Sequence, residues 1–238
     1  MFDHVTIRVS DLAASTAFYS TVLAREPQGE EFLEWDDFSI APVEENRPLT
    51  RHLHVAFAAP SHDEVDAFWR RGVEAGYASD GGPGLRPQYD PNYYGSFLLD
   101  PDGNSAEACC GFRKGGDSSI DHLWIGVRDL GESRRFWETV APVLGLGLSE
   151  PGEQRFHVYA RHRSSALVAD GRPPTEHVHL AFPVPDDATV AEFHRVATAA
   201  GFRDNGAPGE RPEYHAGYVG AFVLDPDGNN VEAVNHNR

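Results

Sequence analysis

In the first half of the chain, short stretches of alternating hydrophobic and polar residues are each followed by a helical pattern. Val5, Ile7 and Val9 alternate with polar residues, which is the period of two expected for a strand with one packed face. Hydrophobic residues at helical spacing follow, and Ser10 or Asp11 is a suitable N-cap for that helix. The pattern therefore predicts a strand that leads directly into a helix.

The same order of strand and helix begins again near residue 52. Residues 52–59 have the pattern of a second strand, and residues 63–75 that of a second helix, which Gly76 is suited to end. A final hairpin is predicted to join residues 95–99 to residues 105–109, because Pro-Asp-Gly at its tip supplies turn-forming residues. The first half of the chain is therefore predicted to run strand, helix and further strands, and then strand, helix and hairpin.

The second half of the chain repeats the first. The matching segments are residues 3–5 with 121–123, residues 52–57 with 177–182, and residues 100–104 with 225–229. The offset is 118 at the first match and 125 at the other two, so the second copy contains extra residues early on. Residues 113–119 are polar and contain glycine, as linkers commonly do. We therefore expect two tandem domains, residues 1–113 and 120–238.

Charge and cysteine content restrict the class of protein. Asp and Glu number 37 against 20 Lys and Arg, giving a formal charge of −17 that would repel nucleic acids and anionic membrane surfaces. Cys109 and Cys110 are adjacent, which makes a structural disulfide implausible and favours a reducing compartment. No targeting segment or membrane-spanning apolar run is apparent. These features predict a cytoplasmic protein that binds neither nucleic acid nor membrane.

Three strands of each copy direct one possible metal ligand toward the face that the helices do not cover. Alternation places His54 opposite the hydrophobic residues of its strand, Glu107 on a face with small neighbours, and His4 opposite Val5 and Ile7. Two imidazoles and a carboxylate form a facial triad that suits Fe²⁺, Mn²⁺ or a related divalent ion. Without a metal, they would be hydrogen-bonded strand histidines and solvated glutamates. The second copy repeats the set, which favours metal binding: His122, His179 and Glu232.

A second repeated set of residues comes just before each final hairpin. It has the form Arg-Pro-x-Tyr followed by Tyr-x-Gly. One hypothesis is a substrate-binding loop in which the guanidinium binds an oxyanion and the tyrosines form aromatic walls. The alternative is a loop whose Pro and Gly fix a bend while the tyrosines pack. The candidate substrate-binding residues are Arg86, Tyr89, Tyr93, Arg211, Tyr214 and Tyr218.

These motifs resemble those of the vicinal oxygen chelate superfamily, which includes glyoxalase I, bleomycin-resistance proteins and extradiol dioxygenases. The matching motifs are the opening Asp-His-Val/Leu, the His-x-Ala-Phe strand and the Leu-Asp-Pro-Asp-Gly-Asn-x-x-Glu hairpin. The resemblance covers nearly the whole chain and implies an α+β fold of tandem glyoxalase-like domains. Each domain would consist of two paired βαβββ modules whose curved mixed sheets form a cleft around a metal. It assigns the ligand sets His4, His54, Glu107 and His122, His179, Glu232.

The resemblance leaves two structural questions open. Modules of this superfamily pair within one domain or exchange between domains, so His4 could instead join His179 and Glu232. Glyoxalase I also uses a fourth protein ligand from the end of its first module. That region of this chain offers only Glu44 or Glu45, or Asp170 in the second copy, without a matching motif.

The resemblance implies a divalent-metal enzyme acting on a small substrate that is chelated through adjacent oxygens. Lyase, isomerase, transferase and dioxygenase chemistry all remain open, as does the metal, which could be Fe²⁺, Mn²⁺, Zn²⁺ or Ni²⁺. One alternative is a bleomycin-resistance-like protein that sequesters a small aromatic compound without metal chemistry. Another is one active site beside one structural copy. The chain is expected to be a monomer with paired domains or a homodimer.

Overall fold

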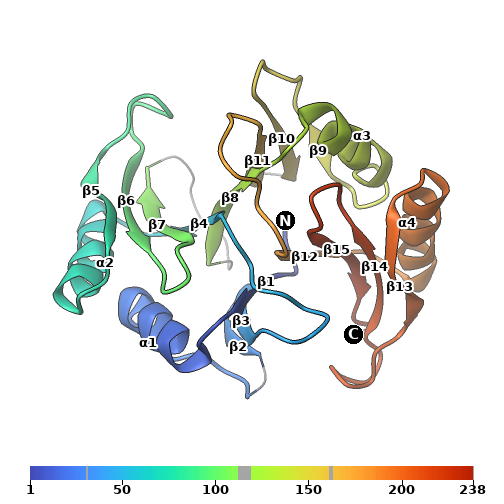
Figure 1. Ribbon diagram of the computed structural model, residues 1–238, viewed down its shortest axis with the longest axis horizontal. Helices are drawn as coiled ribbons and strands as arrows, with labels where there is room; N and C mark the ends of the chain where they lie inside the picture. The colour runs from blue at the N-terminus through green and yellow to red at the C-terminus, as the bar shows by residue number, and fades with distance from the viewer. Residues whose placement is uncertain (31, 112–118, 161–162, 238) are drawn as a thin grey trace. The chain divides into compact units, whose positions relative to one another are not determined.

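The chain folds into two compact units in the computed structural model, which describes residues 1–30, 32–111, 119–160 and 163–237 (Figure 1). We call Ile7–Trp124 the central unit. The terminal unit combines Met1–Thr6 with Ile125–Arg238. These units do not coincide with the two sequence copies, because the start of the first strand belongs with the second copy and residues 120–124 belong with the first. Residues 113–118 of the predicted linker lie outside the described residues.

The central unit contains a mixed sheet in the order β5-β6-β7-β4-β8. Strands β4 and β7 run parallel, whereas β6 is antiparallel to both β5 and β7. Helix α2 lies along β5 and β6 (Figure 1). The elements are the end of β1 (His4–Val9), α1 (Leu12–Leu23), β2 (Leu33–Trp35), β3 (Phe38–Pro42), β4 (Leu53–Ala58), α2 (His62–Glu74), β5 (Ser79–Leu85), β6 (Tyr94–Leu99), β7 (Ser105–Cys110) and the start of β8 (Ile120–Gly126).

The terminal unit repeats this arrangement with the strand order β13-β14-β15-β12-β1. Strands β12 and β15 run parallel, and β1 is antiparallel to β12. Helix α4 packs on β13, β14 and β15 (Figure 1). The remaining elements are α3 (Leu130–Val140), β9 (Gly147–Leu148), β10 (Arg155–Ala160), β11 (Arg163–Val168), β12 (His179–Pro183), α4 (Asp187–Ala199), β13 (Arg203–Glu210), β14 (Val219–Leu224) and β15 (Asn230–Asn235).

Local features of the first strand and helix follow the sequence pattern, with one difference. Asp11 caps α1 by accepting a hydrogen bond from the backbone N–H of Ala14 at 3.0 Å. The polar positions of β1, however, are not solvated, since Thr6 and Arg8 are both buried. The Arg8 guanidinium reaches the Glu44 carboxylate at 2.8 Å. At Thr6 and Arg8 both faces of β1 are therefore covered, and the alternation there marks polar contacts rather than exposure to water.

The Asp-Pro-Asp-Gly-Asn turn joins the last hairpin of each half to the histidine-bearing strand. Gly228 has φ +90°, a left-handed conformation that L-residues with a Cβ rarely adopt. The fully buried Asn229 accepts a hydrogen bond from the Val178 N–H at 3.1 Å and donates one to the Thr175 carbonyl at 3.1 Å. This contact fixes the start of β15 beside the start of β12. Asn104 makes the equivalent contact with the Leu53 N–H.

Removing this buried amide is expected to destabilise the protein. In Asn229→Ala, the Val178 N–H loses its acceptor inside the protein, and an unsatisfied buried donor costs about 1–3 kcal/mol. Urea unfolding should therefore show a loss of about 2 kcal/mol, whereas Asn46→Ala at an exposed position should change stability by less than about 0.5 kcal/mol. Equal stability of Asn229→Ala and the unmodified protein would show that the turn does not hold the two strands together.

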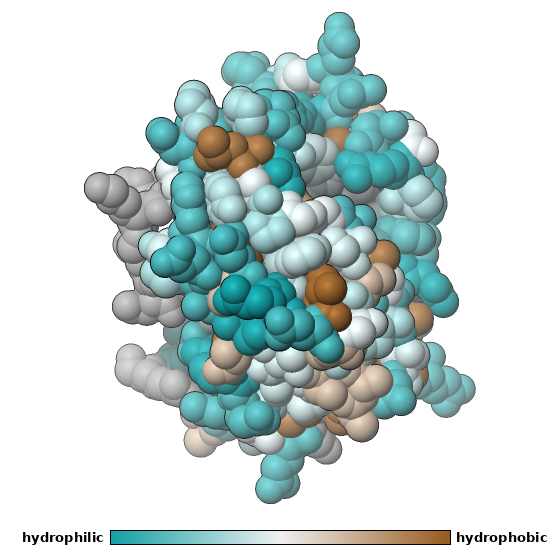
Figure 2. All heavy atoms as spheres, turned by 90° about the vertical axis from the view of Figure 1, so that its left-hand side faces the viewer, coloured by the Kyte–Doolittle hydropathy of each residue, from teal (hydrophilic) through white to brown (hydrophobic). Residues whose placement is uncertain are grey.

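The surface offers no broad hydrophobic area on the face drawn in Figure 2, which is mostly hydrophilic with small, separate hydrophobic patches. Across the described residues, no helix combines the length and the apolar character needed to span a membrane. The large hydrophobic side chains that are exposed are scattered singly, which is normal for a folded protein: Val43, Val73, Leu85, Tyr89, Tyr159 and Tyr214.

Two candidate metal centres

The terminal unit brings two imidazoles and a carboxylate together on three adjacent strands. We call His4 of β1, His179 of β12 and Glu232 of β15 the terminal triad. His179 Nε2 lies 3.0 Å from Glu232 Oε2 and 3.1 Å from His4 Nε2, and His4 Nε2 lies 3.8 Å from the same oxygen. Strand register explains the convergence, because His4 and Glu232 flank the buried Ala181 from either side.

The central unit forms the same cluster from the other three residues. We call His54 of β4, Glu107 of β7 and His122 of β8 the central triad. His54 Nε2 lies 2.9 Å from Glu107 Oε2, and His122 Nε2 lies 3.7 Å from that oxygen. Ala56 pairs with Glu107 across the parallel strands, as Ala181 does with Glu232. A small residue at this position leaves room for three ligands, which gives the Ala of the His-x-Ala-Phe motif a physical reason.

The spacing of the ligand atoms fits a divalent ion. With metal–ligand bonds of about 2.1 Å, neighbouring ligand atoms lie about 3.0 Å apart at a right angle and about 3.4 Å apart in a tetrahedron. The separations of 3.0, 3.1 and 3.8 Å in the terminal triad are close to these values. The two histidines are part-buried and the glutamate is almost fully buried, so the carboxylate is shielded while the imidazoles keep some contact with solvent. The donor set suits Fe²⁺, Mn²⁺, Zn²⁺ or Ni²⁺.

A buried tyrosine holds one oxygen of each glutamate. Tyr218 donates its hydroxyl hydrogen to Glu232 Oε1 at 2.7 Å, and Tyr93 does the same for Glu107 Oε1 at 2.7 Å. Burial and the nearby carboxylate raise the pKa of the Tyr218 phenol, which keeps it a neutral donor. Since Oε1 is taken by the tyrosine, Oε2 is the oxygen that each glutamate presents to the histidines.

A glycine on the neighbouring strand makes room for this pair of groups. A Cβ atom on Gly220 would lie 2.5 Å from Glu232 Oε1 and 3.2 Å from the Tyr218 ring. Gly95 has the same relation to Glu107, again at 2.5 Å. The repeated Tyr-x-Gly sequence therefore encodes both the tyrosine that orients the glutamate and the space that the carboxylate occupies.

An aspartate orients the first-strand histidine of each triad. Asp3 Oδ1 accepts from His4 Nδ1 at 2.8 Å, and Asp121 Oδ1 accepts from His122 Nδ1 at 2.8 Å. With the proton on Nδ1, Nε2 keeps the lone pair that a metal needs. Burial opposes ionisation of Asp3, but its hydrogen bonds and charge interactions with His4 and His236 outweigh burial and lower the pKa of that carboxyl.

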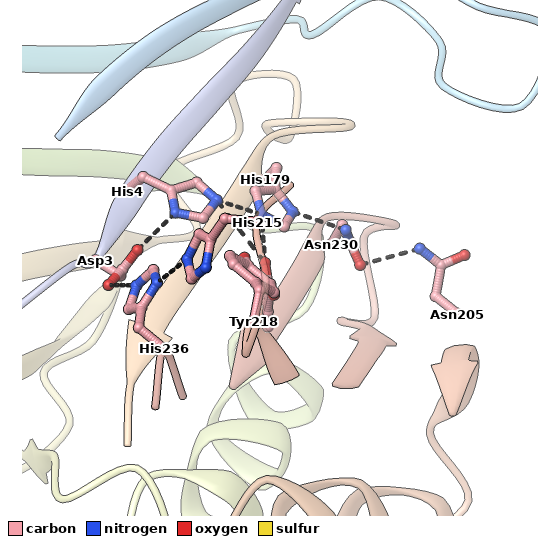
Figure 3. A network of polar contacts seen from close by, with 9 residues as sticks. Asp3, His4, His179, Asn205, His215, Tyr218, Asn230 and His236 are labelled. Atoms are coloured by element: carbon pink, nitrogen blue, oxygen red, sulfur yellow. Dashed lines mark hydrogen bonds and ion pairs between the residues drawn. The ribbon is translucent and has the colours of Figure 1, made fainter. Parts of the chain in front are cut away.

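The terminal unit extends this contact into a chain of histidines (Figure 3). His236 Nε2 lies 2.7 Å from Asp3 Oδ2, and His236 Nδ1 lies 2.8 Å from His215 Nε2. On the other side of the cluster, Asn230 lies against His179 (Figure 3). The corresponding positions of the first copy, 125 residues earlier, are Gly111 and Asp90, so this histidine pair occurs only around the terminal triad.

The six candidate ligands form two groups, and each group combines residues of both sequence copies. The grouping within each copy, in which His4 joins His54 and Glu107, does not occur. The first-strand histidine of each copy instead lies with the second-strand histidine and the glutamate of the other copy. This is the exchanged arrangement that the sequence left open. The reason is that β1 pairs with β12, which the local pattern of alternation cannot specify.

The candidate substrate-binding loop makes mostly internal contacts. Arg86 donates to the carbonyl oxygen of Gly82 at 2.7 Å and lies over the Phe97 ring, and Arg211 does the same with Ala207 and Phe222. Their guanidinium groups therefore help to fix the bend. Tyr93 and Tyr218 are buried against the glutamates. Tyr89 and Tyr214 are exposed, and their rings contact the rings of Tyr93 and Tyr218 edge-on. A role of these residues in substrate binding stays a prediction.

The possible fourth ligands have other partners. Glu44 Oε1 accepts from Arg8 at 2.8 Å, and Asp170 Oδ2 accepts from Arg172 at 2.9 Å. Among the described residues, neither these two carboxylates nor that of Glu45, which is exposed, falls in a ligand group with either triad. Within the part of the chain that the structure describes, each triad therefore offers three candidate protein ligands.

Sequence reasoning missed a thiol beside the central triad. Cys109 forms a second possible ligand group with Asp121 and His122. Burial and the Glu107 carboxylate raise the pKa of the Cys109 thiol, which keeps it protonated, and the thiol is buried in one cluster with Ala56 and Tyr93. The signal was available, because Cys109 occupies the same strand face as Glu107 two residues earlier.

Comparison with known proteins identifies the family. The chain belongs to the Glyoxalase/Bleomycin resistance protein/Dioxygenase superfamily, whose model matches residues 1–108 and 119–233. This confirms the family resemblance and the α+β fold of tandem glyoxalase-like domains. No curated protein sequence matches the chain.

Solved structures show the same fold over nearly the whole chain. Glyoxalase I from Zea mays is 18% identical with a TM-score of 0.70, over 99% of this chain and 92% of that one. A proposed dioxygenase from Bacillus subtilis is 13% identical with a TM-score of 0.64, over 98% of this chain and 84% of that one. At these identities the likeness establishes the fold, and the chemistry has to be argued from the triads.

Proposed function

We propose that this protein is a divalent-metal-dependent enzyme that acts on a small substrate chelated through two adjacent oxygens. The observation that supports this most is the convergence of three potential ligand atoms in each triad, from strands far apart in the sequence. Held there, a divalent ion would polarise the substrate oxygens as a Lewis acid. Lyase, isomerase, transferase and dioxygenase reactions all use such polarisation, and the three-ligand set is compatible with each.

The residues around each triad have distinct roles in this proposal. Glu232 and Glu107 would neutralise part of the charge of a bound ion, and the tyrosines hold one oxygen of each carboxylate in a hydrogen bond. Asp3 and Asp121 hold the imidazoles in the ligating tautomer. Both triads are complete within one chain, so we propose that no partner subunit is needed to assemble either site.

Each triad offers three candidate protein ligands, which argues against a glyoxalase I reaction that depends on a fourth protein ligand. Glu44 and Asp170 are each paired with an arginine. The exposed Tyr89 and Tyr214 are the best candidates to form aromatic walls for the substrate. We therefore expect the substrate to combine an adjacent pair of oxygens with a planar or apolar group.

Metal analysis and ligand binding test the proposal together. Protein purified without chelators, then loaded with Mn²⁺ and desalted, should retain two ions per chain. A catechol whose absorption changes on chelation should then bind, and removal of the metal should abolish that change. The variant Glu107→Gln/Glu232→Gln should show neither retention nor the optical change.

The same experiment separates the enzyme from a sequestering protein. Saturable binding of an aromatic compound that is equal with and without metal, and equal in the doubly substituted variant, would contradict the proposal. It would favour the bleomycin-resistance-like alternative, in which the clefts bind a ligand and the triads take no part.

A further inference from the structure

The second-strand histidine of the central triad is supported by a relay that ends on a carboxylate. His54 Nδ1 lies 3.2 Å from the Ser105 hydroxyl oxygen. That hydroxyl donates its hydrogen to Asp80 Oδ2 at 2.9 Å. Because a hydroxyl has only one hydrogen, the serine oxygen has to accept from His54 Nδ1. The relay therefore places the proton on Nδ1 and leaves the lone pair on Nε2, which faces Glu107.

The terminal triad replaces this relay by two amides. His179 Nδ1 lies 2.7 Å from the Asn230 amide, which lies 2.9 Å from the Asn205 amide (Figure 3). Asn230 and Asn205 stand 125 residues after Ser105 and Asp80, the same offset that relates the histidines and the glutamates. The two relays are thus equivalent in position and differ in chemistry.

An amide pair does not choose a tautomer in the way that a carboxylate does. Each amide has a donor at one end and an acceptor at the other, so the pair accommodates His179 with the proton on either ring nitrogen. A carboxylate only accepts, and a histidine whose Nδ1–H is directed toward one is a more basic metal ligand. The first-strand histidines have the same direct partner in both triads, since each donates to an aspartate at 2.8 Å. In the terminal triad, His236 also contacts that aspartate, at 2.7 Å.

We infer that the two centres are inequivalent, and that the central triad binds a divalent ion more tightly because Ser105 and Asp80 position His54. This rests on the proposed function, since it concerns the same metal centres. Loss of such outer partners commonly costs 10–100-fold in metal affinity. Asp80 is exposed, so water screens its charge, and we expect a difference of about 10-fold, the lower end of that range.

Zinc titration in competition with a chromophoric chelator tests the inference one centre at a time. The Glu232→Gln background reports the central triad, and Glu107→Gln reports the terminal triad. The double variant supplies the blank for other zinc sites, such as the His215–His236 pair. We expect the zinc dissociation constant of the central triad to be about 10-fold lower than that of the terminal triad.

Reciprocal exchange of the relays shows whether they cause the difference. Asp80→Asn should weaken the central triad about 10-fold and leave the terminal triad unchanged. Asn205→Asp combined with Asn230→Ser should raise the zinc affinity of the terminal triad about 10-fold. No such gain is expected if Ser105 and Asp80 only support the local structure. The single exposed substitution Asp80→Asn keeps the test valid if the combined variant does not fold.

The outcomes distinguish this inference from the proposed function. Equal zinc affinities in the two backgrounds, or a central triad that is indifferent to Asp80→Asn, would overturn the inference while two metal centres remained. Absence of zinc binding above the blank in both backgrounds would overturn the inference and the proposed function together.

Discussion

Glu232→Gln is expected to remove one divalent ion per chain and to leave the other in place. Gln keeps the shape of the side chain and can still accept the Tyr218 hydrogen bond, but it lacks the anionic oxygen that faces His4 and His179. Loss of an outer partner alone costs up to 100-fold in affinity, so loss of this ligand should cost more than about 100-fold. Elemental analysis after desalting should find one ion where the unmodified protein holds two.

The matched variant is Glu107→Gln, which should empty the central triad by the same argument. Thermal unfolding of both metal-free variants would verify that each still folds. Retention of two ions by either variant would contradict the assignment of that glutamate as a ligand. Loss of both ions from one single variant would show that the centres are not independent.

The second large effect is expected from a single methyl group. Gly220→Ala would place a Cβ atom 2.5 Å from Glu232 Oε1, closer than real Cβ atoms approach other groups. Either the carboxylate or the Tyr218 ring must shift, and overpacking of this kind costs about 1–3 kcal/mol. Because the displaced oxygen belongs to a ligand, we expect terminal metal affinity to fall by at least about 10-fold, the effect of losing an orienting partner.

Titration of the terminal triad in the Glu107→Gln background measures this effect directly. Gly217→Ala in the same background is the control, because a Cβ there would come no closer than 3.4 Å to any atom and lies away from Glu232. Gly217 also has φ +82°, so its substitution tests whether local strain alone changes the affinity. Unchanged affinity in Gly220→Ala would mean that the carboxylate position is not critical.

The strands that carry the candidate ligands, and the faces on which these residues lie, could be read from the sequence because strand alternation is a local property. The His54 side chain has to face away from Leu53 and Val55 in any extended strand, whatever its neighbours. The helix that Asp11 caps is equally local. Both features were correctly predicted, as was the turn at Gly228.

The grouping of the ligands could not be read in this way. Whether His4 lies beside His54 or His179 depends on which strand pairs with β1, and alternation contains no information about the neighbour. The roles of Tyr93 and Tyr218 were missed for a similar reason, because their hydroxyl contacts depend on the register of the hairpin.

The outer relay residues, Asp80 and Asn205, were missed because the sequences of their strands are not typical of strands. Asp80 lies in β5 (Ser79–Leu85) and Asn205 in β13 (Arg203–Glu210), both rich in Gly and containing Pro. Such composition predicts a loop. Each segment is instead a bulged strand at the edge of its sheet, where irregular pairing with β6 or β14 tolerates these residues.

The exchange of first-strand histidines is the central claim, and crossed double variants test it most directly. His4→Ala/Glu232→Gln places both substitutions in the terminal triad and should retain one ion per chain, held by the central triad. His4→Ala/Glu107→Gln damages both triads and should retain none. The opposite result, with one ion in His4→Ala/Glu107→Gln and none in His4→Ala/Glu232→Gln, would show that His4 serves Glu107 and would contradict the account.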